Sequence, residues 1–374
     1  EVVVLFQMIL HTITILFLYK LFLKFNTPNV LAIIFSLAIG FNPNLLLYSS
    51  KLLPQQILGV LIFFTMYFSI ELIKTWEIDN HIFRNKNLYL SGIFSGIAFI
   101  TKPSWMLGII PVVLTLFYIK KISKKTILVS LILISLHFSL NIVWSEYKKE
   151  IGNEKVYGID STSMIENIVF FVKGINFNDG AIRLGLVEHA KGTPLYEKLQ
   201  ERNLISLAKG MNGDVNENYL NLIRSLSWEE RSDVDFAKAI LRNAPVKYFM
   251  GQLSTWHTFF TKRMFSPSGF PGLPSIGKYI YTGSYYNLYR PLLPILLILF
   301  LALFKIKALR PAVVLISLTL IYFSLLHALF LASPQHFIYY RTSVEYILFF
   351  AAFLPIGYLY NQIKAQIIKS YKTI

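Results

Sequence analysis

The sequence predicts an all-α polytopic membrane protein, and three observations support this fold class. Of the 374 residues, 55% are hydrophobic, 16% are aromatic and only 15% are charged, with a mean hydropathy of +0.53. Soluble domains carry about 25% charged residues. Apolar runs near the roughly 20 residues that a membrane-spanning helix needs recur along the chain, and 36 Lys and Arg against 20 Asp and Glu accompany them. A soluble enzyme is therefore excluded.

Nine apolar runs qualify as membrane spans, since a kinked or protein-shielded span can be shorter than 20 residues. The stretch from Leu88 to Ile119 is predicted as two short helices. Two helices bring the four-lysine loop 120–125 to the side that holds Lys20 and Lys24, as the positive-inside rule requires. The nine runs are Val2–Lys24, Asn29–Tyr48, Pro54–Lys74, Leu88–Thr101, Pro103–Ile119, Thr126–Trp144, Pro291–Phe304, Pro311–Ala332 and Tyr346–Tyr360.

Charge divides the chain into three parts. We predict transmembrane helices over 1–145, an extracytoplasmic domain with a membrane-proximal loop over 146–289, and transmembrane helices with a cytoplasmic tail over 290–374. Residues 146–278 contain 17 basic and 15 acidic residues, whereas the apolar flanks contain 19 and 5. Basic loops between apolar spans are typical of a membrane protein, whereas a nucleic-acid-binding protein concentrates its charge on a soluble domain. We therefore expect membrane lipids as partners and no nucleic acid.

Helix signals make the middle part a mainly helical domain. Ser227 and Glu230 have the spacing of a capping box, which predicts a helix from Ser227 to about Asn243. That helix stops before Pro245, and a second helix is predicted to follow. Four apolar residues at helical spacing in that second helix are predicted to pack on the domain or at the membrane interface. They are Phe249, Leu253, Trp256 and Phe260.

The chain contains no cysteine and no Asn-x-Ser/Thr sequon, which excludes disulfides and thiolate chemistry and is typical of a bacterial protein. Residue 1 is Glu, and the apolar run follows it without the basic leader of a signal peptide. We expect the natural N-terminus to lie upstream. The expected location is the bacterial inner membrane, with the large domain on the periplasmic or extracellular side.

Four cations fall at the outer ends of different spans, namely Lys51, Lys102, Arg290 and Arg341. A lone cation beside hydrocarbon is costly unless it meets a carboxylate, a headgroup or an anionic ligand. Apart from Glu1, the only acid on that face of the flanks is Glu345, which we expect to pair with Arg341. A site for a lipid phosphate explains the excess of cations. The alternative is that each cation snorkels to ordinary headgroups.

Polar and aromatic residues lie beside these cations. Aromatic faces and hydrogen bonds commonly bind sugars, although Tyr and Trp also form interfacial belts. We expect Tyr48, His336 and Tyr340 in the wall of a single cavity, and Asn42 and Asn44 on the same face. Three of the apolar spans contain a histidine, and His11, His137 and His327 are expected to be hydrogen-bonded packing residues. No metal site is predicted, since Glu77, Asp79 and His81 fit a solvated cytoplasmic loop.

Several segments resemble a known family. The runs FNPNLLLYSSKLLPQQILGVLIFF and LSGIFSGIAFITKPSWMLGIIPVVLTLF are similar to consecutive membrane segments of bacterial relatives of protein O-mannosyltransferases and aminoarabinose transferases. These are polytopic glycosyltransferases of the GT-C fold (family 39-like). The segment YYRTSVEYILFFAAFLPI resembles their Arg-Tyr-Arg-x-Pro-x-x-Pro motif, with Arg341 on the second arginine and Tyr340 on the tyrosine, whereas Tyr339, Ser343 and Tyr346 depart from it. FAKAILRNAPVKYF resembles a helix, Asn-Pro, helix stretch of their periplasmic domain.

The resemblance implies a reaction and a GT-C-like bundle with a mainly helical extracytoplasmic domain. Such enzymes move a sugar from a polyprenyl phosphate to a hydroxyl of a lipid, glycan or protein acceptor, with inversion at the anomeric carbon. A carboxylate in their first extracytoplasmic loop is the general base, which we expect upstream of Glu1, so that the chain alone is expected to be inactive. An acid that holds a divalent metal in the family is replaced by Gln55, or by Gln56 in a shifted alignment, and no cofactor is identified.

Other functions remain open at this stage. An O-antigen ligase or polymerase-like enzyme, which uses a lipid diphosphate, also has a large outer loop and outer-face arginines. A transporter is less consistent with the sequence, because the span interiors contain no ionisable residue other than histidine. A non-catalytic membrane scaffold is the remaining alternative.

Overall fold

The computed structural model describes residues 2–49, 54–76, 82–150, 175–213, 216–254, 256, 292–330 and 341–371. Within these ranges the regular structure is helical, and no strand occurs. The chain divides into two compact units. Unit 1 draws on Glu1–Trp144, Arg263–Phe323 and Arg341–Ile374, and unit 2 on Ser145–Lys262 and Ser324–Tyr340. The prediction of an all-α chain is confirmed for the described residues.

Five described helices are long and apolar enough to cross a membrane. They are α1 (Val2–Lys24), α4 (Pro54–Thr75), α7 (Lys124–Glu150), α18 (Arg310–Phe330) and α20 (Glu345–Tyr371). Shorter apolar helices accompany them: α2 (Asn29–Gly40), α5 (Lys86–Thr101), α6 (Ile110–Lys120) and the helix Leu292–Lys305. These lengths agree with a polytopic membrane protein.

The predicted span Asn29–Tyr48 is wrong as a single helix. The structure ends α2 at Gly40 and begins α3 (Pro43–Ser49) after a short turn. Asn42 accepts a hydrogen bond from the backbone N–H of Asn44 through its side-chain oxygen, at 2.8 Å, and Pro43 takes the first helical position. Proline lacks the N–H that would continue α2, and Asn is a favoured N-cap.

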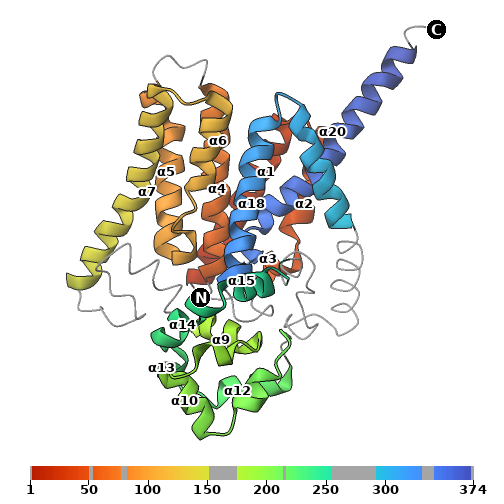
Figure 1. The fold of residues 1–374 in the computed structure, drawn as a ribbon. Coiled ribbons are helices and arrows are strands. Elements are labelled where there is room, and N and C mark those ends of the chain that lie inside the picture. Colours follow the sequence, from red (N-terminus) through yellow and green to blue (C-terminus); the bar gives the residue numbers. More distant parts are fainter. Residues whose placement is uncertain are drawn as a thin grey trace. The chain divides into compact units, whose positions relative to one another are not determined.

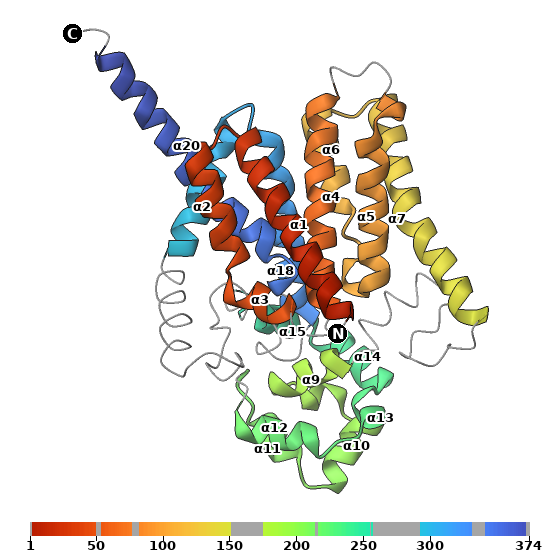
Figure 2. The same ribbon diagram turned by 180° about the vertical axis from the view of Figure 1, so that it is seen from behind.

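The stretch from Leu88 to Ile119 does contain two helices, as predicted. Between α5 and α6, a short 3-10 turn covers Pro103–Trp105, and extended backbone at Lys102 ends α5. α4 and α5 form an antiparallel hairpin, joined by Ser69 Oγ and Ser91 Oγ at 2.7 Å. Figures 1 and 2 show α4, α5, α6 and α7 side by side in unit 1.

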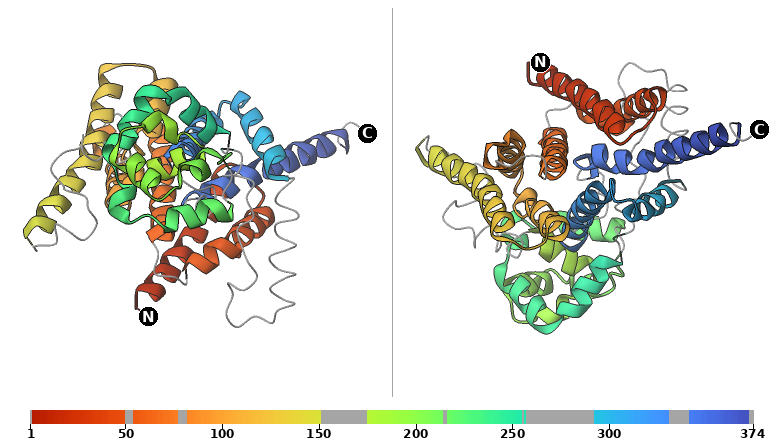
Figure 3. Two further views of the ribbon diagram at one scale, coloured as in Figure 1. Left: turned by 60° about the horizontal axis from the view of Figure 1, so that its bottom comes forward. Right: turned by 90° about the horizontal axis from the view of Figure 1, so that it is seen from above.

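Three helices of unit 1, α1, α4 and α20, run in the same direction and contact one another. In α1, the ring of Phe17 packs against those of Phe64 and Tyr67 in α4, each with centroids 5.1 Å apart. Phe22 packs against Phe350 of α20 at 4.8 Å. Seen from above, α4 and α5 are nearly end-on, whereas α20, the blue helix at the C-terminus, is strongly inclined to them (Figure 3).

Unit 2 is a cluster of short helices around an apolar core. Phe177, Leu199, Phe236 and Tyr248 belong to this core, and the ring of Phe177 stacks on that of Tyr248 at 4.1 Å. The helices are α9 (Ile175–Arg183), α10 (Pro194–Glu201), α11 (Ile205–Lys209), α12 (Glu217–Arg224), α13 (Trp228–Arg231), α14 (Val234–Asn243) and α15 (Pro245–Leu253), with a 3-10 turn at Val187–Ala190.

One of the two helix predictions for unit 2 needs correction. The capping box of Ser227 and Glu230 is present, but the helix that it opens ends at Arg231, because Asp233 caps a new helix, α14, by accepting from the backbone N–H groups of Asp235 and Phe236. On α15, the fully buried residues are Tyr248 and Gln252; Phe249 of the predicted stripe is half-buried and packs against the core of unit 2, as expected, and Leu253 is half-buried. Phe260, the end of that stripe, lies outside the described residues.

Candidate functional site

The candidate site is a buried polar cluster at the start of α20. Arg341 and Glu345 are each only 1% exposed, and Nε of Arg341 lies 3.5 Å from Oε1 of Glu345. The two residues are one helical turn apart, a spacing at which opposite charges meet. The ion pair expected between them is therefore present. A charge pair this deeply buried is costly to assemble from water, and such pairs are found where geometry or function requires them.

The turn between α2 and α3 supplies a second partner for the carboxylate. Asn44 Nδ2 donates a hydrogen bond to Glu345 Oε1 at 2.7 Å. Asn44 is itself positioned by Asn42, whose side chain caps α3. The Asn-Pro-Asn sequence that breaks the predicted span thus aims an amide at Glu345. Residues about 300 positions apart in the chain meet at this point.

A chain of hydrogen bonds continues the cluster into α1 and α4. The hydroxyl of Tyr346 lies 2.6 Å from Nδ1 of His11, and Gln56 Nε2 is a long 3.5 Å from the same hydroxyl. His11 Nε2 lies 3.0 Å from the carbonyl oxygen of Gly40 at the end of α2. Tyr346 of α20 thus contacts α1 through His11 and α4 through Gln56, and His11 extends the link to α2. These contacts position the first turn of α20.

Gly59 allows α4 to approach the backbone beside Arg341. A Cβ at Gly59 would lie 3.3 Å from the carbonyl oxygens of Thr342 and Ser343, closer than most Cβ contacts. Glycine at this position brings the axis of α4 against the turn that carries Arg341. The contact also establishes that Arg341 lies level with Gly59 along α4.

The register of the α4–α5 hairpin places Lys102 at the same level. Ser69 lies opposite Ser91, and Asn85 donates to Thr75 Oγ1 at 2.7 Å near the hairpin loop. The rise per residue is the same in both helices. Lys102 lies 11 residues after Ser91, and Leu58 lies 11 residues before Ser69. Lys102 is therefore opposite Leu58, one residue from Gly59. Lys102, which is half-buried, and the buried Arg341 therefore lie at the same height along α4.

A closed hydrogen-bond network holds the turn that follows Lys102. His137 Nε2 lies 2.8 Å from the carbonyl oxygen of Met106, which only accepts, so Nε2 carries the proton and the neutral ring accepts from Ser95 Oγ at 2.9 Å. Trp105 Nε1 donates to the same Ser95 Oγ at 3.1 Å. These partners confirm the expectation that His137 is a packing histidine. The indole of Trp105, which is fully buried, anchors the turn.

Some polar atoms of the cluster have no hydrogen-bond partner within the described residues. They are Oε2 of Glu345, Oε1 of Gln55, Oε1 of Gln56 and Oγ of Ser343. An unpaired buried acceptor is destabilising by about 1–3 kcal/mol. A ligand with several hydroxyl donors satisfies the oxygens of Glu345, Gln55 and Gln56, whereas a purely anionic ligand can accept, among these groups, only from the Ser343 hydroxyl. The cluster therefore combines an arginine suited to an anion with acceptors suited to hydroxyl groups.

The chemistry of the cluster does not suit a divalent cation. Glu345 already pairs with Arg341, and Gln55 offers only a neutral carbonyl in place of a carboxylate, whereas Mg²⁺ and Ca²⁺ are held mainly by carboxylate oxygens. Within the described ranges, no group of three or more His, Cys, Asp or Glu side chains has the arrangement of a metal site. The trio Glu77, Asp79 and His81 lies outside those ranges.

The other predicted site residues are less fully described. Lys51, Arg290, His336 and Tyr340 lie outside the described residues, and Tyr48 lies in α3 with its side chain outside the description. Convergence of all four cations on one cavity therefore stays a prediction. His11 and Tyr346 were not predicted as parts of the site. His11, a polar residue inside an apolar run, was the available signal for one of them.

Gln56, rather than Gln55, extends into the cluster. Its side chain is fully buried and contacts Tyr346, whereas Gln55 is half-buried. Comparisons of the chain with protein-family models, curated proteins and solved structures find no significant match.

Proposed function

We propose that the chain is a membrane glycosyltransferase of GT-C type, which transfers a sugar from a polyprenyl phosphate to an acceptor hydroxyl on the extracytoplasmic face of a bacterial inner membrane. The observation behind the proposal is the buried Arg341–Glu345 pair in the segment that resembles the Arg-Tyr-Arg motif of that family. Unfilled acceptors beside it suit the hydroxyl groups of a sugar. Lipid, glycan and protein hydroxyls are all possible acceptor classes.

The roles follow from the reaction. The bond between the anomeric carbon and a phosphate oxygen breaks, a bond to the acceptor oxygen forms, and the acceptor proton passes to a general base. In the proposal, Arg341 stabilises the negative charge that develops on the leaving phosphate. Glu345 and Asn44 orient Arg341, and Lys102 adds a second cation at the same level. The family resemblance places the general base in the first extracytoplasmic loop, outside the cluster.

Binding of the lipid phosphate tests the proposal without requiring turnover. The ligands are undecaprenyl monophosphate, the corresponding diphosphate and the uncharged polyprenol, each titrated into the purified chain in phosphatidylcholine nanodiscs. We expect the monophosphate to bind best. Arg341→Gln is expected to weaken its binding by about tenfold or more, since a charge-assisted hydrogen bond is lost.

Glu345→Gln is the matched control, because it removes the other charge of the same pair. It leaves the cation in place but removes a group that orients it, so monophosphate binding is expected to weaken less than in Arg341→Gln. The double variant Arg341→Gln/Glu345→Gln contains no unpaired buried charge and separates loss of binding from misfolding. Equal binding of polyprenol and monophosphate contradicts the proposal, and a clear preference for the diphosphate supports the ligase or polymerase alternative instead.

A further inference from the structure

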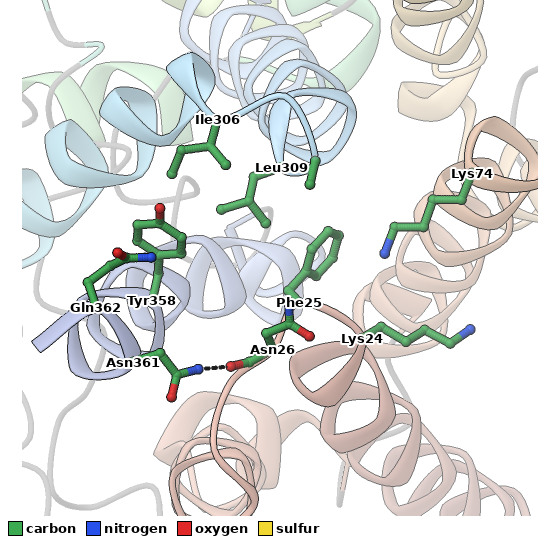
Figure 4. Close-up of a pocket in the computed structure, with 10 residues that line it drawn as sticks. Lys24, Phe25, Asn26, Lys74, Ile306, Leu309, Tyr358, Asn361 and Gln362 are labelled. Atoms are coloured by element: carbon green, nitrogen blue, oxygen red, sulfur yellow. Dashed lines mark hydrogen bonds between the residues drawn. The ribbon is translucent and has the colours of Figure 1, made fainter. Parts of the chain in front are cut away.

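A cavity of about 280 Å³ lies at the end of unit 1 remote from Arg341. Its walls come from the last turns of α1 and α4, the segment before α18, and the second half of α20. Lys74, Phe25, Leu309 and Tyr358 are among the residues around it (Figure 4). Along α20, Tyr358 lies about 20 Å from Glu345 at 1.5 Å per residue. The cavity is therefore separate from the candidate site.

Lys74 is the cation of this cavity. Its amino group lies 3.9 Å from the centroid of the Phe25 ring and extends toward the cavity in Figure 4. Lys24 extends away from the cavity, where it pairs with Glu71 at 2.5 Å and donates to Tyr67 at 3.1 Å. An ammonium group over a ring keeps three N–H donors, so Lys74 is able to bind an anion without leaving Phe25.

The remaining walls combine polar groups with apolar surface. Asn361 donates to the carbonyl oxygen of Asn26 and closes one side, as Figure 4 shows. Gln362 and Tyr358 lie across from Lys74, whereas Ile306 and Leu309 form an apolar wall. A ligand with an anionic group and an adjoining apolar part matches this division. The volume lies below the ~300–1,000 Å³ of sites that enclose a drug-sized molecule, which suits a headgroup.

The surroundings of the cavity favour an anion. Lys305, Lys307 and Arg310 lie beside or between Ile306 and Leu309 of the apolar wall, and Lys364 lies farther along α20. α18 begins at Arg310, so that its positive helix end is near the cavity. Glu71 is the only acid in these bordering segments of the described chain, and Lys24 pairs with it. Cation-rich segments beside membrane spans bind anionic lipid headgroups.

We infer that this cavity is a binding site for a phosphate group, with Lys74 as its principal ligand and the glycerophosphate headgroup of an anionic phospholipid as the occupant. A free phosphate has the same chemistry, and the experiment distinguishes the two sources. The inference does not depend on the proposed transferase activity, because it concerns different residues at the other end of the same helices.

Lys125 provides a matched control for Lys74. Both are lysines of unit 1 helices with a cation–π contact, and Lys125 Nζ lies 5.2 Å from the ring centroid of Trp76, but Lys125 does not contribute to the cavity. Native mass spectrometry of the purified chain, titrated with phosphatidylglycerol or phosphatidylcholine, measures headgroup binding. We expect Lys74→Gln to weaken phosphatidylglycerol binding about tenfold, and Lys125→Gln to change it less than twofold.

A third variant changes the volume without changing charge. Ala308 is exposed at the rim, so Ala308→Trp obstructs the cavity with little risk to folding, and we expect it to weaken phosphatidylglycerol binding as Lys74→Gln does. Inorganic phosphate is then added as a competitor. Displacement of the lipid by millimolar phosphate identifies free phosphate as a ligand of the site, and absence of displacement identifies the lipid headgroup. Equal losses in the two lysine variants, or undiminished binding in Ala308→Trp, overturn the inference.

Discussion

Single residues determine how the candidate site is held together, and His11 is the clearest case. Its Nε2 faces the carbonyl oxygen of Gly40, which accepts hydrogen bonds but cannot donate them. The proton of the neutral ring is therefore on Nε2, and Nδ1 accepts the hydroxyl proton of Tyr346 at 2.6 Å. One neutral imidazole thus joins α1, α2 and α20 with both of its nitrogens satisfied.

Removing the hydroxyl of Tyr346 tests this arrangement. In Tyr346→Phe, Nδ1 of His11 loses its donor in a buried environment, which is expected to destabilise the fold by about 1–3 kcal/mol. Tyr19→Phe is the control, since the Tyr19 hydroxyl donates to Asn29 Oδ1 at 2.7 Å in an exposed position. Thermal unfolding in detergent is expected to show a clear loss for Tyr346→Phe and little change for Tyr19→Phe. Equal loss in both contradicts the role of burial.

The sequence identified the charged members of the site more readily than their neutral partners. Arg341 and Glu345 stand out because charges are rare beside apolar runs, and their spacing of four residues predicts the pair. Tyr346 does not stand out, because one more tyrosine near a membrane interface is ordinary. Its contact with His11 joins positions 335 residues apart, and no local pattern encodes such a pairing.

At the scale of whole helices, small residues determine how closely α5 and α7 pack. Gly92 and Gly96 form a Gly-xxx-Gly pair on α5, and a Cβ on Gly96 would lie 3.0 Å from the carbonyl oxygen of Leu136 and 3.1 Å from that of His137. Glycine pairs at this spacing allow the backbones of membrane helices to approach closely. The close approach also brings Ser95 within reach of His137.

Substitution of Gly96 tests this packing. Gly96→Val is expected to push α5 away from α7 and to destabilise the protein by about 1–3 kcal/mol, because two of the three nearest atoms are backbone oxygens that cannot move aside as the Leu140 side chain can. Gly210→Ala is the control, since a Cβ there would meet its nearest atoms at an ordinary 3.6 Å and φ is negative. Thermal unfolding of both variants measures the difference. An unchanged midpoint for Gly96→Val rejects the close-packing account.

The capping box of α13 gives a prediction for unit 2. Ser227→Ala removes the bond to the N–H of Glu230, which is expected to cost about 1 kcal/mol of local stability. The backbone N–H of Ser227, followed by Arg202, holds the pKa of Glu230 below its usual value. The carboxylate therefore stabilises the cap fully above its ordinary pKa of about 4.3, and this contribution is lost progressively as the pH falls from there through the lowered pKa of the folded state.

Hydrogen exchange of a peptide that covers residues 227–233 measures both effects. After correction for intrinsic rates, protection is expected to fall in Ser227→Ala at neutral pH and in the wild-type chain at pH 3. Protection that does not change with pH removes the role assigned to Glu230.

Cap chemistry also explains which helix boundaries the sequence analysis missed. Asn42 with Pro43, and Asp233, are typical cap sequences, and both lie inside runs whose apolar pattern continues across the break. Periodicity alone joined the segments, whereas the capping side chains separate them. Conversely, the division of Leu88–Ile119 was predicted because charge placement, a property of the whole chain, required an additional crossing.

For the molecule as a whole, the distribution of lysine and arginine predicts which parts face the cytoplasm. Ser123 lies in the four-lysine loop and Asn212 in unit 2, and both are exposed. The chain contains no cysteine, so Ser123→Cys and Asn212→Cys are each labelled at one position only. An impermeant thiol reagent on intact cells is expected to label Asn212→Cys and to leave Ser123→Cys unlabelled. The reverse result inverts the predicted topology.

The length and inclination of α20 relate the protein to the thickness of its bilayer. With 27 residues, α20 is about 40 Å long, whereas the hydrocarbon core of a typical bilayer is about 30 Å thick. The apolar stretch of α20, Tyr346–Tyr360, is only about 22 Å long, and a stretch shorter than the core is accommodated by local thinning of the bilayer or by flanking residues that reach the interface. Its first turn carries Glu345, and its later turns border the Lys74 cavity. A thinner membrane thus matches the apolar stretch of α20 more closely than a thicker one, and the polar turns beyond Tyr360 extend past the hydrocarbon core.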